Sequence, residues 1–214
     1  MKNFLTILFL FTALASQGQY HRHTYRVTPV NGTPPPTYAT WNPSDKAAGI
    51  TLSGGNLTSA GTGSGVEMVR ATVVLSGLKY WEITATTIGS SRTGFAKSAE
   101  SLSNYMGTTT DSYGKAEDNV YWYNNTPSYT GTAIANGDTI MVAVNTSTGN
   151  AWWGRNGTWD NSGNPATGAN PAFTGISGSF YPAFQSGYSA ATMTANFGAT
   201  AFTYTPPSGF SGVY

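Results

Sequence analysis

The side chains that could carry acid–base chemistry in this chain are nine carboxylates and two histidines. Two carboxylates that face each other across a cleft, one with a raised pKa, can hydrolyse a glycosidic bond, so glycosidase is the enzyme class that they leave open. Local sequence gives them simpler roles, because Asp138 lies in a polar turn, Glu82 in a strand and Glu117-Asp118 in a solvated turn. The full set is Asp45, Glu67, Glu82, Glu100, Asp111, Glu117, Asp118, Asp138 and Asp160.

Other routes to catalysis lack a residue that they require. A Ser-His-Asp triad needs a histidine in the folded part, and both histidines, His21 and His23, lie near the N-terminus. The chain has no cysteine, which removes thiolate nucleophiles and disulfide bonds alike. Residues 160–164 begin like a calcium-binding loop but lack a glutamate at the twelfth position, which favours a polar loop. We therefore expect no catalytic residue, no cofactor and no metal site.

The composition predicts a single all-β domain. The 214 residues include 26 glycines, are 14% aromatic and only 9% charged, which fits short strands joined by tight turns better than helices. The formal net charge is +1 and no basic run occurs, so nothing attracts a phosphate backbone. Nucleic acid is not an expected partner.

Residues 1–19 have the pattern of a secretory signal peptide. Lys2 supplies a positive start, residues 4–15 are apolar, and Ala13 and Ala15 have the spacing that a signal peptidase reads. The apolar run is shorter than the ~20 residues of a membrane-spanning helix. The alternative to a signal peptide is that this run forms a buried strand or helix of the domain. Residues 20–37 read as a spacer, because consecutive prolines favour an extended polyproline conformation. We expect a secreted, cell-surface or periplasmic protein whose domain spans residues 38–214.

The stretch 76–85 is the strongest candidate for a central strand of that domain. With the two-residue period of a strand, Trp81 shares an apolar face with Ile83 and Ala85. Glu82 then lies on the opposite face, where we expect a hydrogen-bonded structural carboxylate. Because one tryptophan removes roughly 150–250 Å² from water, the Trp81 face should form the core.

Further strands are expected at short intervals between turn signals. Residues 38–41 should form a short strand that ends in a turn at 42–45, and residues 69–75 should pair through Ser76-Gly77 with the central strand. Asn156-Gly157 is the strongest hairpin signal in the chain. The remaining strands are expected at residues 50–58, as a hairpin around Gly54-Gly55, as a pair within 112–123, and at 93–97, 140–144, 150–154, 181–186 and 192–197. This pattern is typical of a β-sandwich or barrel.

Several of these segments resemble the motifs of SPRY domains, the core of B30.2 modules. Residues 76–83, SGLKYWEI, are similar to the SGKxYWEV strand of the family, and residues 136–144 to its GDvIgvalD strand. Residues 152–159 resemble its l.f.kNG.w hairpin. The other matches follow in the family's order at residues 93–96, 106–114, 173–176 and 181–184. The closing segment from Asn196-Phe197-Gly198 resembles the version found in bacteria and their phages.

The resemblance implies a bent sandwich of two antiparallel sheets with a concanavalin-like jelly-roll architecture. Members of the family bind protein partners or short peptides through loops at one end, and they share no catalytic machinery. Asn145 stands where many members carry aspartate, and Leu78 where lysine or arginine is commoner. Neither difference affects the fold, but both argue against transferring a particular partner.

Exposed aromatic side chains are the predicted basis of binding. With 13 tyrosines and 6 tryptophans, the chain has more than one core needs, and adaptable recognition loops are rich in such residues. The loops that contribute contacts in peptide-binding members hold Asn104-Tyr105 and Gly187-Tyr188 here, whereas Trp81, Trp152 and Phe197 should be core. The candidate ligand-binding residues, all in predicted loops, are Arg92, Asn104, Tyr105, Tyr123, Tyr129, Trp159 and Tyr188.

These observations leave three hypotheses for function. The first is an exported, non-catalytic SPRY module that recognises a protein or peptide. The second is a glycan-binding adhesin on a cell surface or virion appendage, in which the same aromatic rings stack on sugars. The third is a carboxylate glycosidase.

Overall fold

The computed structural model describes residues 35–128 and 131–214, and the signal and spacer predictions for residues 1–34 lie outside that range. Its strands form two seven-stranded sheets in which every pair is antiparallel. In spatial order, the first sheet holds β1 (Trp41–Lys46), β4 (Glu67–Ala71), β13 (Tyr181–Ser186), β6 (Ser91–Ala96), β7 (Ser112–Ala116), β8 (Tyr121–Tyr123) and β9 (Thr126–Ser128). The second holds β12 (Thr158–Trp159), β11 (Asn150–Arg155), β10 (Thr139–Asn145), β5 (Leu78–Thr87), β14 (Thr192–Asn196), β3 (Thr58–Ala60) and β2 (Thr51–Ser53).

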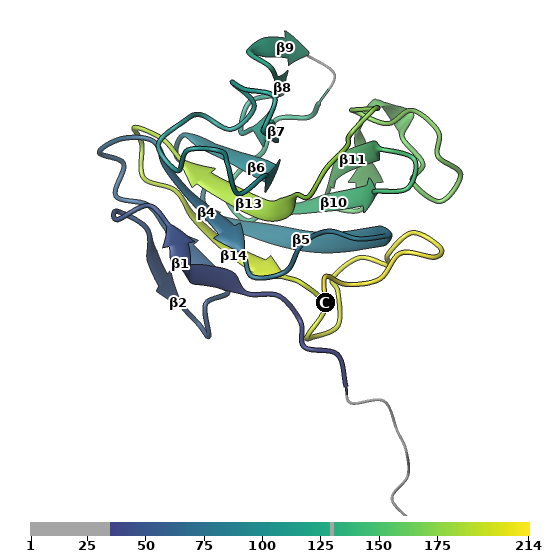
Figure 1. Cartoon of the computed structure of the whole chain (residues 1–214), viewed down its shortest axis with the longest axis horizontal. Helices are drawn as coiled ribbons and strands as arrows, with labels where there is room; N and C mark the ends of the chain where they lie inside the picture. The colour runs from purple at the N-terminus through teal and green to yellow at the C-terminus, as the bar shows by residue number, and fades with distance from the viewer. Residues whose placement is uncertain (1–34, 129–130) are drawn as a thin grey trace, which may run out of the picture. The chain divides into compact units, whose positions relative to one another are not determined.

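The two sheets pack face to face around one hydrophobic core (Figure 1). The centre of the second sheet is β5, where Trp81 and Ile83 point inward and are fully buried. Phe95 of β6 stacks on Trp153 of β11 at a centroid distance of 5.6 Å and so joins the two inner faces. The predicted all-β sandwich is confirmed, and so are the core positions of Trp81 and Phe197, whereas Trp152 is buried in a separate cluster on the other face of the second sheet.

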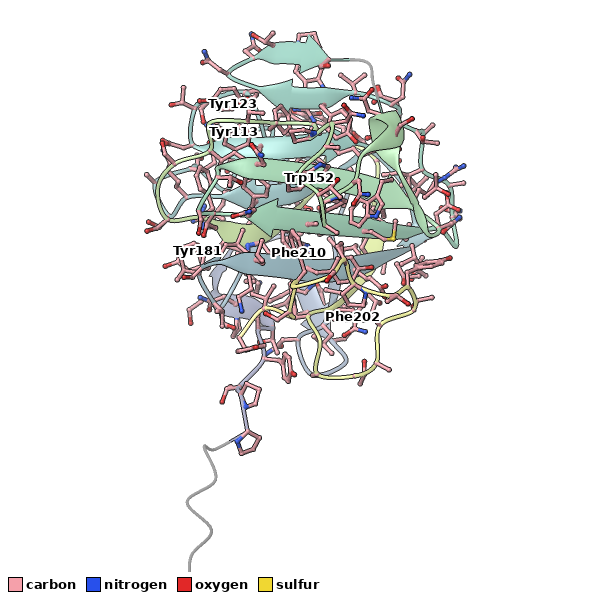
Figure 2. All side chains as sticks on the ribbon, turned by 90° about the vertical axis from the view of Figure 1, so that its right-hand side faces the viewer. Tyr113, Tyr123, Trp152, Tyr181, Phe202 and Phe210 are labelled. Atoms are coloured by element: carbon pink, nitrogen blue, oxygen red, sulfur yellow. The ribbon has the colours of Figure 1, made fainter. Side chains whose placement is uncertain are left out.

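A second aromatic layer covers the outer face of the second sheet. Residues 198–212, after β14, lie across this face, and Phe202 and Phe210 pack over it beside Tyr80 and Trp152 (Figure 2). The aromatic residues do exceed the needs of the inner core, but many of the additional rings cover the outer face of this sheet instead of lying exposed in loops. In the described residues, the large hydrophobic side chains that remain exposed are Val74, Tyr188 and Tyr214.

The predicted pairing of residues 69–75 with the central strand was also wrong. Strand β4 pairs with β1 and β13 in the first sheet, whereas β5 pairs with β10 and β14 in the second. The connection between β4 and β5 crosses from one sheet to the other, and the backbone N–H of Leu75 donates to the carbonyl of Phe180 on the way.

The first strand begins later than predicted. Residues 42–45, expected to form a turn, belong to β1, which pairs with β4 at Trp41 and Lys46 across an irregularity. Pro43 is tolerated there because β1 is an edge strand and the missing N–H breaks no central ladder.

The Asn156-Gly157 hairpin was predicted correctly. Asn156 has φ 50° and Gly157 has φ 84°, as a type I′ turn requires, and the turn joins β11 to β12. It brings Arg155 opposite Thr158 at the end of the second sheet. Within residues 35–128 and 131–214, no helix is long and apolar enough to cross a membrane.

Candidate functional site

Arg92 of β6 lies between two aromatic rings on the outer face of the first sheet. Its guanidinium carbon is 4.8 Å from the ring centroid of Tyr105 and 4.6 Å from that of Trp122, and Nη1 donates a 2.6 Å hydrogen bond to the carbonyl of Met106. Partial burial lowers the pKa of Arg92, although Glu117 and Tyr105 act in the opposite direction. The result is a cation held in a fixed position by stacking.

The segment that carries Tyr105 folds back over its own sheet. Residues 97–111 connect β6 to β7, and Met106 packs against Met68, Ala96 and Ala183 on the outer face. The backbone N–H of Met106 also donates a 2.8 Å hydrogen bond to Gln185. The packing and the hydrogen bond of Met106 therefore fix the position of the adjacent Tyr105.

The buried carboxylate of Glu100 organises this segment from within. It accepts hydrogen bonds from the hydroxyls of Thr109 and Ser112 and, at 3.0 Å, from the side-chain amide of Asn104. Arg70 also holds this segment in place, because its Nη1 donates a 2.8 Å hydrogen bond to the backbone carbonyl of Glu100. A buried carboxylate that is fully hydrogen-bonded stabilises the segment and leaves no free base for catalysis.

Tyr188 lies on the short connection from β13 to β14, beside the start of β6. The residue is 70% exposed, the largest exposure among the large hydrophobic residues that the structure describes. The connection is fixed to the β5–β6 turn, since Ser90 donates to the carbonyl of Ser189 at 3.0 Å and Gly187 to that of Ser90 at 2.6 Å. Because Gln185 pairs with Arg92 in the sheet, Tyr188 follows directly on the strand beside Arg92.

One buried donor lies beneath this surface. Gln185 is fully buried and its Oε1 accepts the hydrogen bond from Met106, but its Nε2 has no hydrogen-bond partner among the described residues. Buried amide groups are normally paired, so an unpaired donor is notable next to a candidate binding surface.

The structure brings some of the predicted site residues together and separates others. Arg92 and Tyr105 are in contact, Asn104 precedes Tyr105, and Tyr188 follows the end of β13, the strand paired with β6. Tyr123 belongs to β8 and stacks on Tyr113 at 4.2 Å, facing the core, so its predicted place in a loop was wrong. Two further predictions failed in the same way, because Arg92 is part of β6 and Trp159 of β12, where Trp159 packs against Tyr80. Tyr129 lies outside the described residues.

Trp122 was not predicted as a site residue. It lies between Tyr121 and Tyr123 on β8, and both tyrosines belong to the inner face. The two-residue period of a strand therefore directs Trp122 to the outer face, toward Arg92. That alternation was the signal in the sequence that could have identified it.

The carboxylates of the domain have structural partners. Asp45 pairs with Arg70 at 2.6 Å, Asp111 with Lys97 at 3.0 Å and Asp138 with Arg155 at 3.2 Å. Glu82 and Asp160 accept hydrogen bonds from tyrosine hydroxyls. Throughout the part of the chain that the structure describes, no three histidine or carboxylate side chains come together in a way that could hold a metal ion.

Comparison with protein families and solved structures agrees with this architecture. The family model of the SPRY domain matches residues 78–200. The chain belongs to the SPRY domain family. Members of this family are generally protein-interaction modules rather than enzymes, which fits the structural roles of the carboxylates.

Two solved structures show the same fold at low sequence identity. The SPRY domain of human HERC1 superposes with a TM-score of 0.61 at 14% identity, over 72% of this chain and 96% of that one. The stonustoxin structure gives a TM-score of 0.60 at 19% identity, over 75% of this chain but only 27% of the toxin chain. No match was found among curated protein sequences. At these identities the likeness supports the fold and leaves the partner undefined.

Proposed function

We propose that this SPRY domain recognises a protein or peptide partner through the surface formed by Arg92, Tyr105, Trp122 and Tyr188, named here the Arg92 surface. The observation that carries the proposal is a guanidinium stacked between two aromatic rings, with the exposed Tyr188 on the connection that follows β13, the strand paired with Arg92. Tyrosine, tryptophan and arginine are the residues that most often dominate the binding energy of protein interfaces.

The Arg92 surface is also pre-organised. Stacking and the hydrogen bond to Met106 already restrict Arg92, and Glu100 holds the segment that carries Tyr105. Binding then costs little side-chain ordering, and each immobilised flexible side chain would otherwise cost about 0.5–1.5 kcal/mol.

The test is a peptide selected from a random library against the wild-type domain, whose affinity is then measured for variants. Truncation of aromatic anchors costs about 2 kcal/mol or more, so the double variant Tyr105→Ala, Tyr188→Ala should bind at least about 30-fold more weakly. Val74→Ala is the matched control, because Val74 is exposed but lies on the connection between β4 and β5. Unchanged affinity of the double variant, with normal folding, would overturn the proposal.

We also propose that the domain is exported, on the basis of the signal-like residues 1–19. The protein isolated from its native host should then begin between residues 16 and 20. N-terminal sequencing measures this directly, and a mature protein that begins at Met1 would contradict export without affecting the binding proposal.

A further inference from the structure

A shallow pocket lies at the end of the second sheet, next to the Asn156-Gly157 turn. Thr132, Arg155, Asn156 and Thr158 line it, and its volume is about 230 Å³. Pockets for drug-sized ligands measure roughly 300–1,000 Å³, so this one has the size for a single side chain or a small acid. It belongs to residues that do not form the Arg92 surface.

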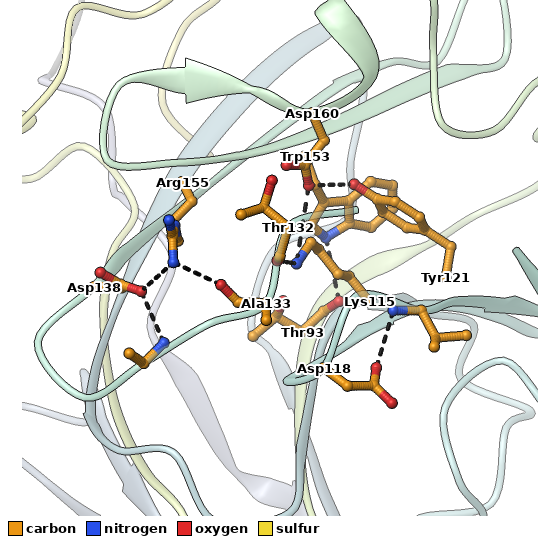
Figure 3. A network of polar contacts seen from close by, with 12 residues as sticks. Thr93, Lys115, Asp118, Tyr121, Thr132, Ala133, Asp138, Trp153, Arg155 and Asp160 are labelled. Carbon is orange, nitrogen blue, oxygen red and sulfur yellow. Dashed lines mark hydrogen bonds and ion pairs between the residues drawn. The ribbon is translucent and has the colours of Figure 1, made fainter. Parts of the chain in front are cut away.

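Arg155 is the one charged side chain among these lining residues, and it is fixed in position. Its Nη1 donates to the carbonyl of Ala133 at 2.7 Å and to Oδ2 of Asp138 at 3.2 Å (Figure 3). Its Nε and Nη2 make no hydrogen bond with the described residues, and the side chain is 36% exposed. This leaves one edge of the guanidinium, with two parallel N–H donors, available in a fixed orientation.

Asp138 does not compete for that edge. Its Oδ1 accepts from the side-chain amide of Asn156 at 2.6 Å, and its Oδ2 accepts from the backbone of Ala135 at 2.8 Å as well as from Arg155. Both oxygens are therefore occupied on the far side of the guanidinium. A second acid can approach the free edge without displacing the first.

The rest of the pocket supplies hydroxyl groups, and a buried ion pair lies behind them. The hydroxyls of Thr132 and Thr158 make no hydrogen bond with any described residue. The ammonium of Lys115, fully buried, donates to the backbone carbonyl of Thr132 and lies 3.9 Å from Asp160 (Figure 3). The groups of the pocket that remain free to donate are therefore the Arg155 N–H groups and the two hydroxyls.

We infer that this pocket, named here the Arg155 pocket, binds the carboxylate of an aspartate or glutamate side chain in a peptide. The two free N–H groups of Arg155 match the two oxygens of a carboxylate in the side-on, bidentate geometry that arginine favours. The hydroxyls of Thr132 and Thr158 can donate to the remaining lone pairs.

The choice of a peptide acid rests on the proposed function, because the Arg155 pocket lies at the same end of the domain as the start of β6. Glu117 connects the two places: its N–H donates to the carbonyl of Ser91 in β6, and its carbonyl accepts from Ile134. Ala133, the next residue back, is the partner of Arg155. A partner seated on the Arg92 surface would extend toward this pocket and place an acidic residue in it.

The experiment is an NMR titration of the labelled domain with N-acetyl-aspartate methylamide and, separately, with the neutral N-acetyl-asparagine methylamide. The acid should cause saturable shifts at the Arg155 side-chain N–H and at the amides of Thr132 and Thr158, with a Kd of about 1–10 mM, as for a fragment-sized ligand. The neutral probe should bind at least about 10-fold more weakly. Because no partner protein is used, the result stands independently of the Tyr105→Ala, Tyr188→Ala test.

Three variants complete the test. Arg155→Lys keeps the positive charge but loses the two parallel N–H donors, so the acid should bind at least about 10-fold more weakly. Thr158→Val leaves the anchors of Arg155 intact, favours a strand and should weaken binding by about 3-fold through loss of one hydrogen bond. Lys97→Gln removes a positive charge elsewhere and should change nothing. Equal affinity for the two probes, or an unchanged affinity in Arg155→Lys with a folded spectrum, would overturn the inference.

Discussion

The hydroxyl of Tyr121 on β8 donates a 2.6 Å hydrogen bond to Oδ2 of Asp160, the residue that follows β12. Strand β8 lies next to the edge strand of the first sheet, and Asp160 directly follows β12, the edge strand of the second, so the bond joins the two sheets (Figure 3). Lys115 of β7 lies 3.9 Å from the same carboxylate and is fully buried. The carboxylate therefore stabilises both a buried hydroxyl and a buried ammonium group.

Asp160→Ala should destabilise the domain strongly, because it leaves Lys115 buried without its counter-charge. Removal of one partner of a buried ion pair costs about 3–5 kcal/mol, and urea denaturation measures the loss. The double variant Lys115→Met, Asp160→Asn removes both charges and should recover a large part of it. If the stability losses of the variants at Lys115 and Asp160 simply add in the double variant, the two residues are not energetically coupled by the ion pair.

Buried tyrosines should make stability fall at alkaline pH. Burial, more than any hydrogen bond, raises the pKa of Tyr80, Tyr113 and Tyr121 above the ordinary value, which is about 10. Above that pH the unfolded chain loses these protons while the folded domain retains them, so the unfolded state is favoured. Each group then lowers the free energy of unfolding by about 1.4 kcal/mol per pH unit.

Urea denaturation from about pH 8 to 11.5 measures this dependence. Burial lowers the pKa of Lys115 in the folded domain. The contribution of Lys115 to the free energy of unfolding therefore increases as the pH rises toward its pKa in the unfolded chain, about 10.4, and is constant above that pH. The tyrosine effect should therefore be clearest above about pH 10.5. Tyr121→Phe should reduce the slope there by about one proton, and an unchanged slope would contradict the assignment.

The inner faces of the sandwich could be predicted from the sequence because alternation along a strand is a local property. Trp81 and Ile83 on β5, and the hairpin at Asn156-Gly157, were assigned correctly on that basis. The partner of β4 could not be assigned, since a short connection with glycine has the same sequence character whether it turns within a sheet or crosses to the other. The path of this connection depends on a long-range contact, the hydrogen bond from the backbone N–H of Leu75 to the carbonyl of Phe180.

The candidate site shows the same limit. The sequence identified the segment around Asn104-Tyr105, but the stacking of Arg92 between Tyr105 and Trp122 depends on how residues 97–111 fold over the first sheet. That fold rests on long-range contacts, such as the hydrogen bond from Arg70 to the carbonyl of Glu100. Single-sequence patterns contain no information on such pairs.

The turn between β11 and β12 should tolerate no side chain at Gly157. A β-branched residue at φ 84° is strained, and a Cβ there would also lie 3.0 Å from the ring of Tyr204. Gly157→Val should therefore lower the free energy of unfolding by more than about 1 kcal/mol. Gly65→Ala is the control, because a Cβ at Gly65 meets no atom within 4 Å and its φ is not positive. Equal melting temperatures of the two variants would contradict the argument.

Glu82→Gln should loosen the segment that covers the outer face of the second sheet. The carboxylate of Glu82 accepts hydrogen bonds at 2.8 Å from the hydroxyl of Tyr80 and from the backbone N–H groups of Thr203 and Tyr204. A glutamine offers one acceptor oxygen, and its amino group would face a donor. The loss should be about 1–3 kcal/mol, because hydrogen bonds to charged groups contribute that much and an unpaired buried donor costs a similar amount.

The position of Glu82 separates this effect from binding. Residues 198–212 should become more sensitive to limited proteolysis in Glu82→Gln, whereas affinity at the Arg92 surface, which lies on the other sheet, should not change. Asp111→Asn is the matched control, since it breaks a partly exposed ion pair with Lys97 that contributes about 0–1 kcal/mol. If both variants unfold at the same urea concentration and resist protease equally, Glu82 does not hold this segment in place. If Glu82→Gln weakens partner binding before it weakens the fold, the carboxylate has a part in recognition instead.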